Sequence, residues 1–126
     1  MITGIIDYGM GNLLSVKNAV EYLGYNAEII NNPKELSRFD KLILPGVGSF
    51  ESCINNLKKF NFIEPLNNEV LINKKKILGI CLGMQVMAKK GFEGGEFDGL
   101  GWFDADVVKI ESKSKKIKVP NIGWKP

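Results

Sequence analysis

Residues 76–85 of the chain read KILGICLGMQ, so that an apolar strand runs through Gly-x-Cys-x-Gly directly into a helical segment. This order is typical of a nucleophile elbow, a sharp strand-to-helix turn that projects one side chain from the end of a sheet. Cys81 occupies the projecting position and is therefore a candidate nucleophile for acyl transfer. A small buried cysteine between two structural glycines would have the same spacing, and the spacing alone does not separate the two interpretations.

Histidine is absent from all 126 residues of the chain. A cysteine nucleophile is normally served by a neighbouring imidazole, which acts as its base. The chain therefore holds a candidate nucleophile with no imidazole to serve it. The sequence leaves open whether this polypeptide is active by itself.

Strand and helix patterns alternate four times along the chain. Short apolar runs predict strands, and apolar residues three or four positions apart predict helices. The predicted strands are Ile2–Tyr8, Asn26–Ile30, Lys41–Leu44 and Ile77–Ile80, and the predicted helical segments are 13–23, 33–39, 49–57, 62–72 and 82–89. This alternation predicts an α/β fold with a doubly wound, mostly parallel sheet that carries helices on both faces.

The pattern changes after Gly91. Glycines at 91, 94, 95, 99 and 101 predict a loop. Residues 106–111 and 115–119 then predict a late β-hairpin around the turn Ser112-Lys113-Ser114. Nothing in this part of the sequence is typical of the natural close of a doubly wound domain.

Glycine-rich loops follow three of the predicted strands, after Tyr8, Leu44 and Ile80. Because the carboxyl ends of parallel strands meet at one edge of a sheet, we expect the functional site at that edge. The loop at 45–50, PGVGSF, precedes the elbow in the sequence and can offer backbone N–H groups to a developing oxyanion. Those donors would be the N–H of Leu82 and one near Val47 or Gly48.

Two alternatives apply to the glycine-rich loops. The 45–50 loop is also compatible with a simple turn or with a phosphate-binding loop, although no Gly-Lys-Ser/Thr follows it. Gly9-x-Gly11 lacks the third glycine of a dinucleotide fingerprint, and we interpret it as a tight turn.

Composition narrows the classes of function. The chain is 44% hydrophobic and 25% charged, with a formal net charge of +3, which is too mild to indicate a nucleic-acid partner. No apolar run approaches the roughly 18 residues of a membrane span. Two cysteines form neither a disulfide framework nor a zinc spacing, and we expect a cytoplasmic protein with no metal and no organic cofactor.

Four segments together resemble the triad-type, class I glutamine amidotransferases. They are DYGMGN at 7–12, LPGVGSF at 44–50, GICLGMQ at 79–85 and PNIGW at 120–124. Within that family the segments are most similar to the glutaminase subunits of imidazole glycerol phosphate synthases. The resemblance spans residues 7 to 124 and implies a flavodoxin-like sheet.

The resemblance implies a reaction. Cys81 would attack the side-chain amide of L-glutamine, release ammonia and leave a glutamyl thioester that water hydrolyses to glutamate. Gly48 and Leu82 match the positions of the oxyanion hole.

The resemblance also implies binding residues. Gln85 matches a residue that holds the substrate, and Glu93 matches an acidic residue that contacts the substrate amino group. Asn12 and Trp124 would lie toward a partner, a (β/α)₈-barrel cyclase subunit that forms a heterodimer with the glutaminase. That cyclase uses the ammonia to make imidazole glycerol phosphate in histidine biosynthesis.

The chain departs from the family in two ways. The catalytic His and Glu of the family lie near its carboxyl end and have no counterpart here, so we expect residues 1–126 to be the N-terminal portion of a single glutaminase domain. Asn121 stands where a histidine is common. These departures leave three alternatives open: ammonia supply for the amidination of cell-surface sugars, a catalytically inactive truncated fragment, and a redox or structural role for Cys81. Without closing strands, we also expect an exposed sheet edge and marginal stability.

Overall fold

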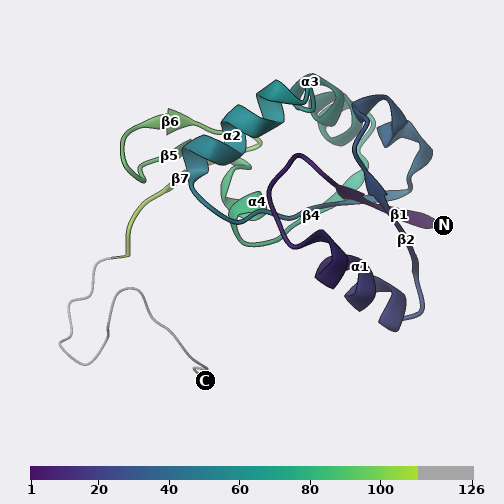
Figure 1. Cartoon of the computed structure of the whole chain (residues 1–126). Coiled ribbons are helices and arrows are strands. Elements are labelled where there is room, and N and C mark those ends of the chain that lie inside the picture. Colours follow the sequence, from purple (N-terminus) through teal and green to yellow (C-terminus); the bar gives the residue numbers. More distant parts are fainter. Residues whose placement is uncertain (111–126) are drawn as a thin grey trace.

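The computed structural model describes residues 1–110, in which four strands form a parallel sheet (Figure 1). These strands are β1 (Ile2–Ile6), β2 (Asn26–Ile30), β3 (Lys41–Leu44) and β4 (Lys76–Gly79), in the order β2-β1-β3-β4. The chain thus adds β2 on one side of β1 and then crosses to add β3 and β4 on the other side. The predicted doubly wound α/β sheet is confirmed, and the switch in direction between β1 and β3 is where such sheets bind ligands.

Helices cover both faces of this sheet, with α1 (Leu13–Tyr22) on one face and α2 (Phe50–Lys59) and α3 (Ile63–Asn67) on the other (Figure 1). The segment predicted at 33–39 is the 3₁₀ helix η1 (Pro33–Arg38), and α3 continues into the π-helical turn η2 (Asn68–Ile72). The predicted helix starts agree with the observed caps. The side chain of Asn32 accepts from the Lys34 N–H, and that of Ser49 accepts from the Ser52 N–H.

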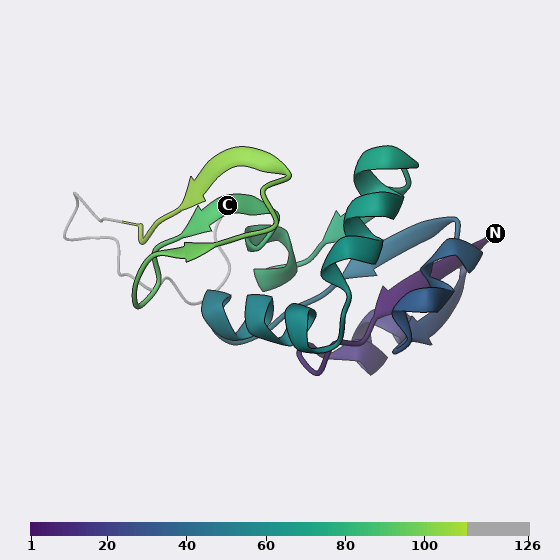
Figure 2. The same ribbon diagram turned by 90° about the horizontal axis from the view of Figure 1, so that it is seen from above.

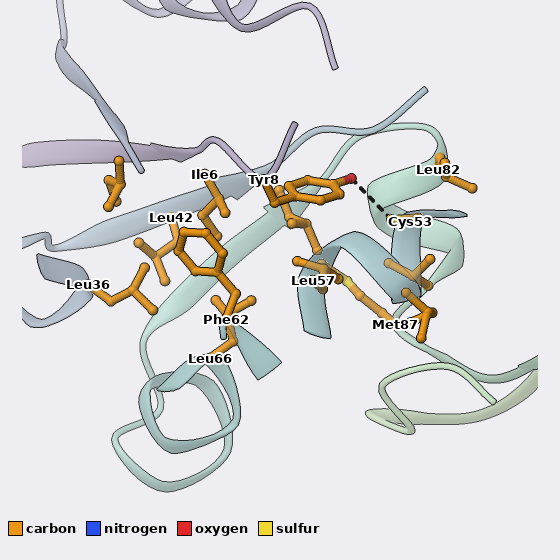
Figure 3. Packing of buried hydrophobic residues seen from close by; sticks show 14 of the residues in the cluster. Ile6, Tyr8, Leu36, Leu42, Cys53, Leu57, Phe62, Leu66, Leu82 and Met87 are labelled. Carbon is orange, nitrogen blue, oxygen red and sulfur yellow. Dashed lines mark hydrogen bonds between the residues drawn. The ribbon is translucent and has the colours of Figure 1, made fainter. Parts of the chain in front are cut away.

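The larger core lies between the sheet and α2. This helix buries Phe50, Cys53, Ile54 and Leu57, which recur at the spacing of one helical face. They pack with Ile6, Tyr8, Leu42 and Phe62, as the close view in Figure 3 illustrates for several of these residues. Burying a large apolar side chain contributes roughly 1.5–3 kcal/mol, so this layer is the main stabilising one.

The opposite face has a smaller core. Only Ile5, Ala27 and Ile43 are buried there, beneath the half-buried residues of α1. The side chains of Leu78 on β4 and Ile80 after it remain 58% and 37% exposed. Among the described residues β4 is an edge strand, so the expected exposed sheet edge and apolar surface are present.

The elbow helix is shorter than predicted. We expected it to reach about Lys89, but α4 (Leu82–Gln85) ends four residues after Cys81, and β5 (Ala88–Gly91) follows. The carbonyl oxygens of Val86 and Met87 accept from the N–H groups of Leu100 and Trp102. Residues 88–91 are instead extended and pair with residues 103–107, so a long-range contact overrides the local helical pattern.

A second sheet occupies the segment predicted as a loop, in the order β6 (Phe97–Asp98), β5, β7 (Phe103–Val107). Figure 2 shows it beyond the carboxyl ends of the main strands, beside α2. The predicted strand at 106–111 is therefore shifted, because β7 ends at Val107 and pairs in parallel with β5. The second arm of the predicted hairpin, at 115–119, lies outside the described residues.

Candidate active site

Cys81 lies at the end of β4 as the N-cap of α4, with φ of 54° and ψ of −117°. Its side chain is exposed, whereas the other cysteine, Cys53, is buried. A non-glycine residue in this conformation stores strain and is found where a fold holds a side chain in a required direction. The interpretation of Cys81 as a small buried cysteine is therefore wrong, and the elbow geometry predicted from the sequence is present.

The glycines on either side of Cys81 are required by close backbone contacts. A Cβ on Gly79 would lie 2.6 Å from the Cα of Met84. A Cβ on Gly83 would overlap the carbonyl oxygen of Leu44 at the end of β3. The Gly83 N–H also donates to the Ile80 carbonyl at 3.0 Å, which closes the turn. The elbow is therefore packed directly against the loop that follows β3.

That loop, residues 45–48, carries the second expected donor. A Cβ on Gly46 would lie 2.9 Å from the backbone nitrogen of Gly83, so the loop lies against the first turn of α4. Gly48 is exposed, with φ of 107°. Within the described residues the N–H of Leu82 donates no hydrogen bond, as expected at the first position of a helix. The structure thus places the loop of Gly48 beside Leu82 at the elbow.

Tyr8, which sequence reasoning missed, lies beneath this loop. Its hydroxyl donates to the Pro45 carbonyl at 2.6 Å and lies 3.1 Å from the Sγ of Cys53 (Figure 3). Asn56 on α2 donates to the Tyr8 carbonyl at 3.1 Å. Burial raises the pKa of Tyr8 far above its ordinary value and raises the pKa of Cys53 to about 11, so both side chains remain protonated at neutral pH. The sequence feature that could have indicated Tyr8 is its place at the end of a buried strand, because a buried tyrosine hydroxyl needs a hydrogen-bond partner.

Gln85 and Glu93 line one pocket of about 430 Å³. Gln85 lies one helical turn after Cys81, and its N–H donates to the Cys81 carbonyl at 3.1 Å. The remaining lining residues, which the sequence did not indicate, are Phe92, Gly94, Val107, Val108 and Lys109. The two residues expected to contact the substrate are therefore brought together in a pocket with an apolar wall, whereas Cys81, Leu82 and Gly48 are not among the residues that line it.

Of the two residues expected to face a partner, the structure describes one. Asn12 is exposed and caps α1, where its Oδ1 accepts from the Ser15 N–H at 3.4 Å. Trp124 lies outside the described residues. A second hollow of about 370 Å³, lined in part by Thr3, Tyr25 and Leu78, lies at the opposite, amino-terminal edge of the sheet and is separate from this site.

Residues 1–110 contain no group of three or more Cys, Asp or Glu side chains arranged to hold a metal ion. In the same range, no helix is both long and apolar enough to cross a membrane.

Comparison with known proteins gives the same family along nearly the whole chain. The family model for class-I glutamine amidotransferases matches residues 4–125. The chain is 51% identical over 120 residues to "Imidazole glycerol phosphate synthase subunit HisH 1" of Campylobacter jejuni, covering 95% of this chain and 59% of that protein. It is 48% identical to "Imidazole glycerol phosphate synthase subunit HisH 2" of Methanococcus maripaludis, covering 95% and 58%.

The chain spans about three fifths of the length of these relatives. A solved structure described as "Crystal structure of glutamine amidotransferase" superposes with a TM-score of 0.70 at 21% identity, covering 84% of this chain and 55% of that one. That likeness shows the fold, and the family model shows the family. The chain therefore belongs to the class-I glutamine amidotransferase family.

Proposed function

We propose that the chain carries the nucleophile and oxyanion-hole half of a glutaminase site, in which Cys81 attacks L-glutamine. The observation that carries this proposal is the exposed Cys81 thiol at a positive φ, next to the N–H of Leu82, which donates to no acceptor within residues 1–110. Gly48 on the neighbouring loop would provide the second N–H for the oxyanion. Removing one such donor typically slows acyl transfer about 10²–10³-fold.

The proposed reaction has two steps. The thiolate of Cys81 forms a bond to the amide carbon, and the carbonyl oxygen becomes an oxyanion held by the two N–H groups. The C–N bond then breaks, and its electron pair leaves with the nitrogen, which must gain a proton to depart as ammonia. Water finally hydrolyses the glutamyl thioester to glutamate and restores the thiol.

An imidazole normally relays that proton from the thiol to the leaving nitrogen, and this chain has no histidine. We infer that a general base from polypeptide other than these 126 residues completes the site. The relatives support this inference, because two fifths of their length lies outside the match.

The pocket beside α4 suits the rest of the substrate. Glu93 would bind the amino group of glutamine, and Gln85 would bind near its side-chain amide. Lys109 lines the same pocket and would pair with the α-carboxylate. Opposite charges on one pocket wall match the zwitterionic end of a free amino acid.

The names of the relatives support a role in histidine biosynthesis, with ammonia delivered to a synthase partner. We propose a cytoplasmic heterodimer with a (β/α)₈-barrel cyclase, with Asn12 and Trp124 toward that partner.

A second candidate is a non-catalytic fragment, which the complete lack of histidine favours. Ammonia supply for sugar amidination would use the same half-site, and the accepting enzyme would distinguish the two pathways.

The test is ammonia release from L-glutamine by the protein made from its native gene, with its cyclase present. Cys81→Ala is expected to abolish the release, and Cys53→Ala, the matched control, to keep it. Unchanged release by Cys81→Ala would refute the proposal. No release by the unaltered protein would favour the non-catalytic candidate.

A further inference from the structure

We propose that Tyr8 is a positioning residue of the glutaminase site, whose hydroxyl holds the 45–48 loop against the elbow so that the Gly48 N–H can serve the oxyanion. This inference rests on the proposed function, and it adds a residue that the motifs did not indicate. Tyr8 does not touch the substrate in this proposal, because it acts through the loop.

The loop makes few other hydrogen bonds. Pro45 has no N–H, and residues 46–48 donate no backbone hydrogen bond to any described residue. Glycine at 46 and at 48 gives the backbone wide conformational freedom. The bond from the Tyr8 hydroxyl to the Pro45 carbonyl is the one hydrogen bond that residues 45–48 make within residues 1–110.

Tyr8 itself is held firmly. Its side chain is 0% exposed, and Asn56 on α2 donates to its backbone carbonyl at 3.1 Å. A carbonyl can only accept, so the single hydroxyl proton of Tyr8 points to Pro45, and the Cys53 thiol donates to the hydroxyl oxygen.

The loop is trapped between Tyr8 and the elbow. A Cβ on Gly46 would lie 2.5 Å from the Tyr8 hydroxyl oxygen on one side and 2.9 Å from the Gly83 nitrogen on the other. Movement of the hydroxyl would therefore move the loop relative to α4. A displacement of about 1 Å at a reacting centre can cost roughly 100-fold in rate.

The test compares two reagents at Cys81 of the full chain, because neither reaction needs a general acid. The first is a glutamine-shaped chloroketone, in which a chloromethyl group replaces the amide nitrogen of L-glutamine. Its C–S bond forms as chloride leaves, while the adjacent carbonyl occupies the oxyanion hole. The second is methyl methanethiosulfonate, which has no carbonyl group and forms a disulfide as methanesulfinate leaves. Mass spectrometry of the Cys81 peptide gives both rates, and their quotient is the selectivity ratio.

Tyr8→Phe keeps the ring and removes only the hydroxyl. We expect its selectivity ratio to fall about tenfold or more, with the thiosulfonate rate unchanged. Cys53→Ala retains the bond from Tyr8 to Pro45 and is expected to keep at least half of the wild-type ratio. Tyr22→Phe makes the same chemical change at a side chain that is 91% exposed and should leave both rates unchanged.

An unchanged ratio in folded Tyr8→Phe would overturn the proposal, and so would an equal fall of both rates. If Tyr8→Phe does not fold, Asn56→Ala replaces it, since it loosens Tyr8 without altering the ring. That variant is expected to lower the ratio severalfold, and an unchanged ratio would again overturn the proposal. Failure of the proposed function is distinct, because L-glutamine would then not slow the labelling of wild-type Cys81 by the chloroketone.

Discussion

The carbonyl oxygen of Leu44 lies where a side chain on Gly83 would have to begin, so the strand before the 45–48 loop and the helix after Cys81 touch through backbone atoms alone. Leu44 also accepts from the Ile80 N–H at 3.0 Å, which binds the elbow to the same residue from its other side. One carbonyl group is thereby in contact with both ends of the turn that carries the thiol. The direction of Cys81 is consequently fixed by β3 as well as by its own strand.

Gly83→Ala should be severely destabilising. The clashing atom belongs to the backbone of a central strand and cannot rotate away, so we expect a loss of about 3 kcal/mol in the free energy of unfolding. Gly24→Ala is the matched control, because Gly24 has φ of 89° with open space around it. Its cost should be about 1 kcal/mol, from backbone strain alone. Urea unfolding measures both, and equal losses would contradict this description of the elbow.

Cys81→Gly should stabilise the chain while it removes the nucleophile. Glycine adopts the observed positive φ without a Cβ clash, and relief of that strain outweighs the extra freedom of glycine in the unfolded chain. We expect a gain of about 1 kcal/mol in urea unfolding. Cys81→Ala keeps the Cβ and should stay within about 0.5 kcal/mol of wild type. A Cys81→Gly variant no more stable than Cys81→Ala would show that the backbone is unstrained.

Glu69 and Lys75 form a largely buried ion pair of 2.7 Å in the connection before β4. Lys75 also donates to the Leu36 carbonyl at 2.8 Å. Glu69→Gln should cost about 3 kcal/mol, because it leaves the ammonium group buried beside a neutral partner. Glu21→Gln breaks the exposed Lys17–Glu21 pair and should cost no more than about 0.5 kcal/mol. Similar losses in the free energy of unfolding for the two variants would contradict the claim that the buried pair contributes more than the exposed one.

Alkaline pH should lower the free energy of unfolding, because the buried Cys53 thiol then loses its proton. Burial raises the pKa of Cys53 from 9.0 to about 11, so the folded state holds this proton more tightly than the unfolded chain does. The resulting stability is complete below about pH 9 and is lost as pH rises to about 11, by at most about 1.4 kcal/mol per pH unit. Cys53→Ala should flatten that part of the curve, although Tyr8, whose pKa is also raised by burial, keeps some slope above pH 10. If the stability of Cys53→Ala depended on pH as that of the wild type does, the Cys53 thiol would be excluded as the cause.

The main sheet and the elbow were predictable because their signals are local. Short apolar runs predicted the four strands, and the helices predicted to start at residues 33 and 49 are capped by side chains that bond only a few residues away. The Gly-x-Cys-x-Gly spacing predicted the elbow at Cys81, and the glycines at 46 and 48 predicted the loop after Leu44.

The second sheet was not predictable, because its cause lies far away in the sequence. The helix after Cys81 stops where the N–H groups of Leu100 and Trp102 take the carbonyls of Val86 and Met87. The role of Tyr8 was hidden in the same way, since its partners Pro45 and Cys53 lie 37 and 45 residues away. Local sequence patterns do not predict such long-range pairings.

The most direct test of Cys81 as the nucleophile of a glutamine site is substrate protection during labelling by the glutamine-shaped chloroketone. We predict that the reagent labels Cys81 and spares Cys53, that L-glutamine slows the labelling, and that D-glutamine at the same concentration does not. Labelling of Cys81 at one rate with or without L-glutamine would contradict the assignment, because the elbow would then present a thiol without a substrate site.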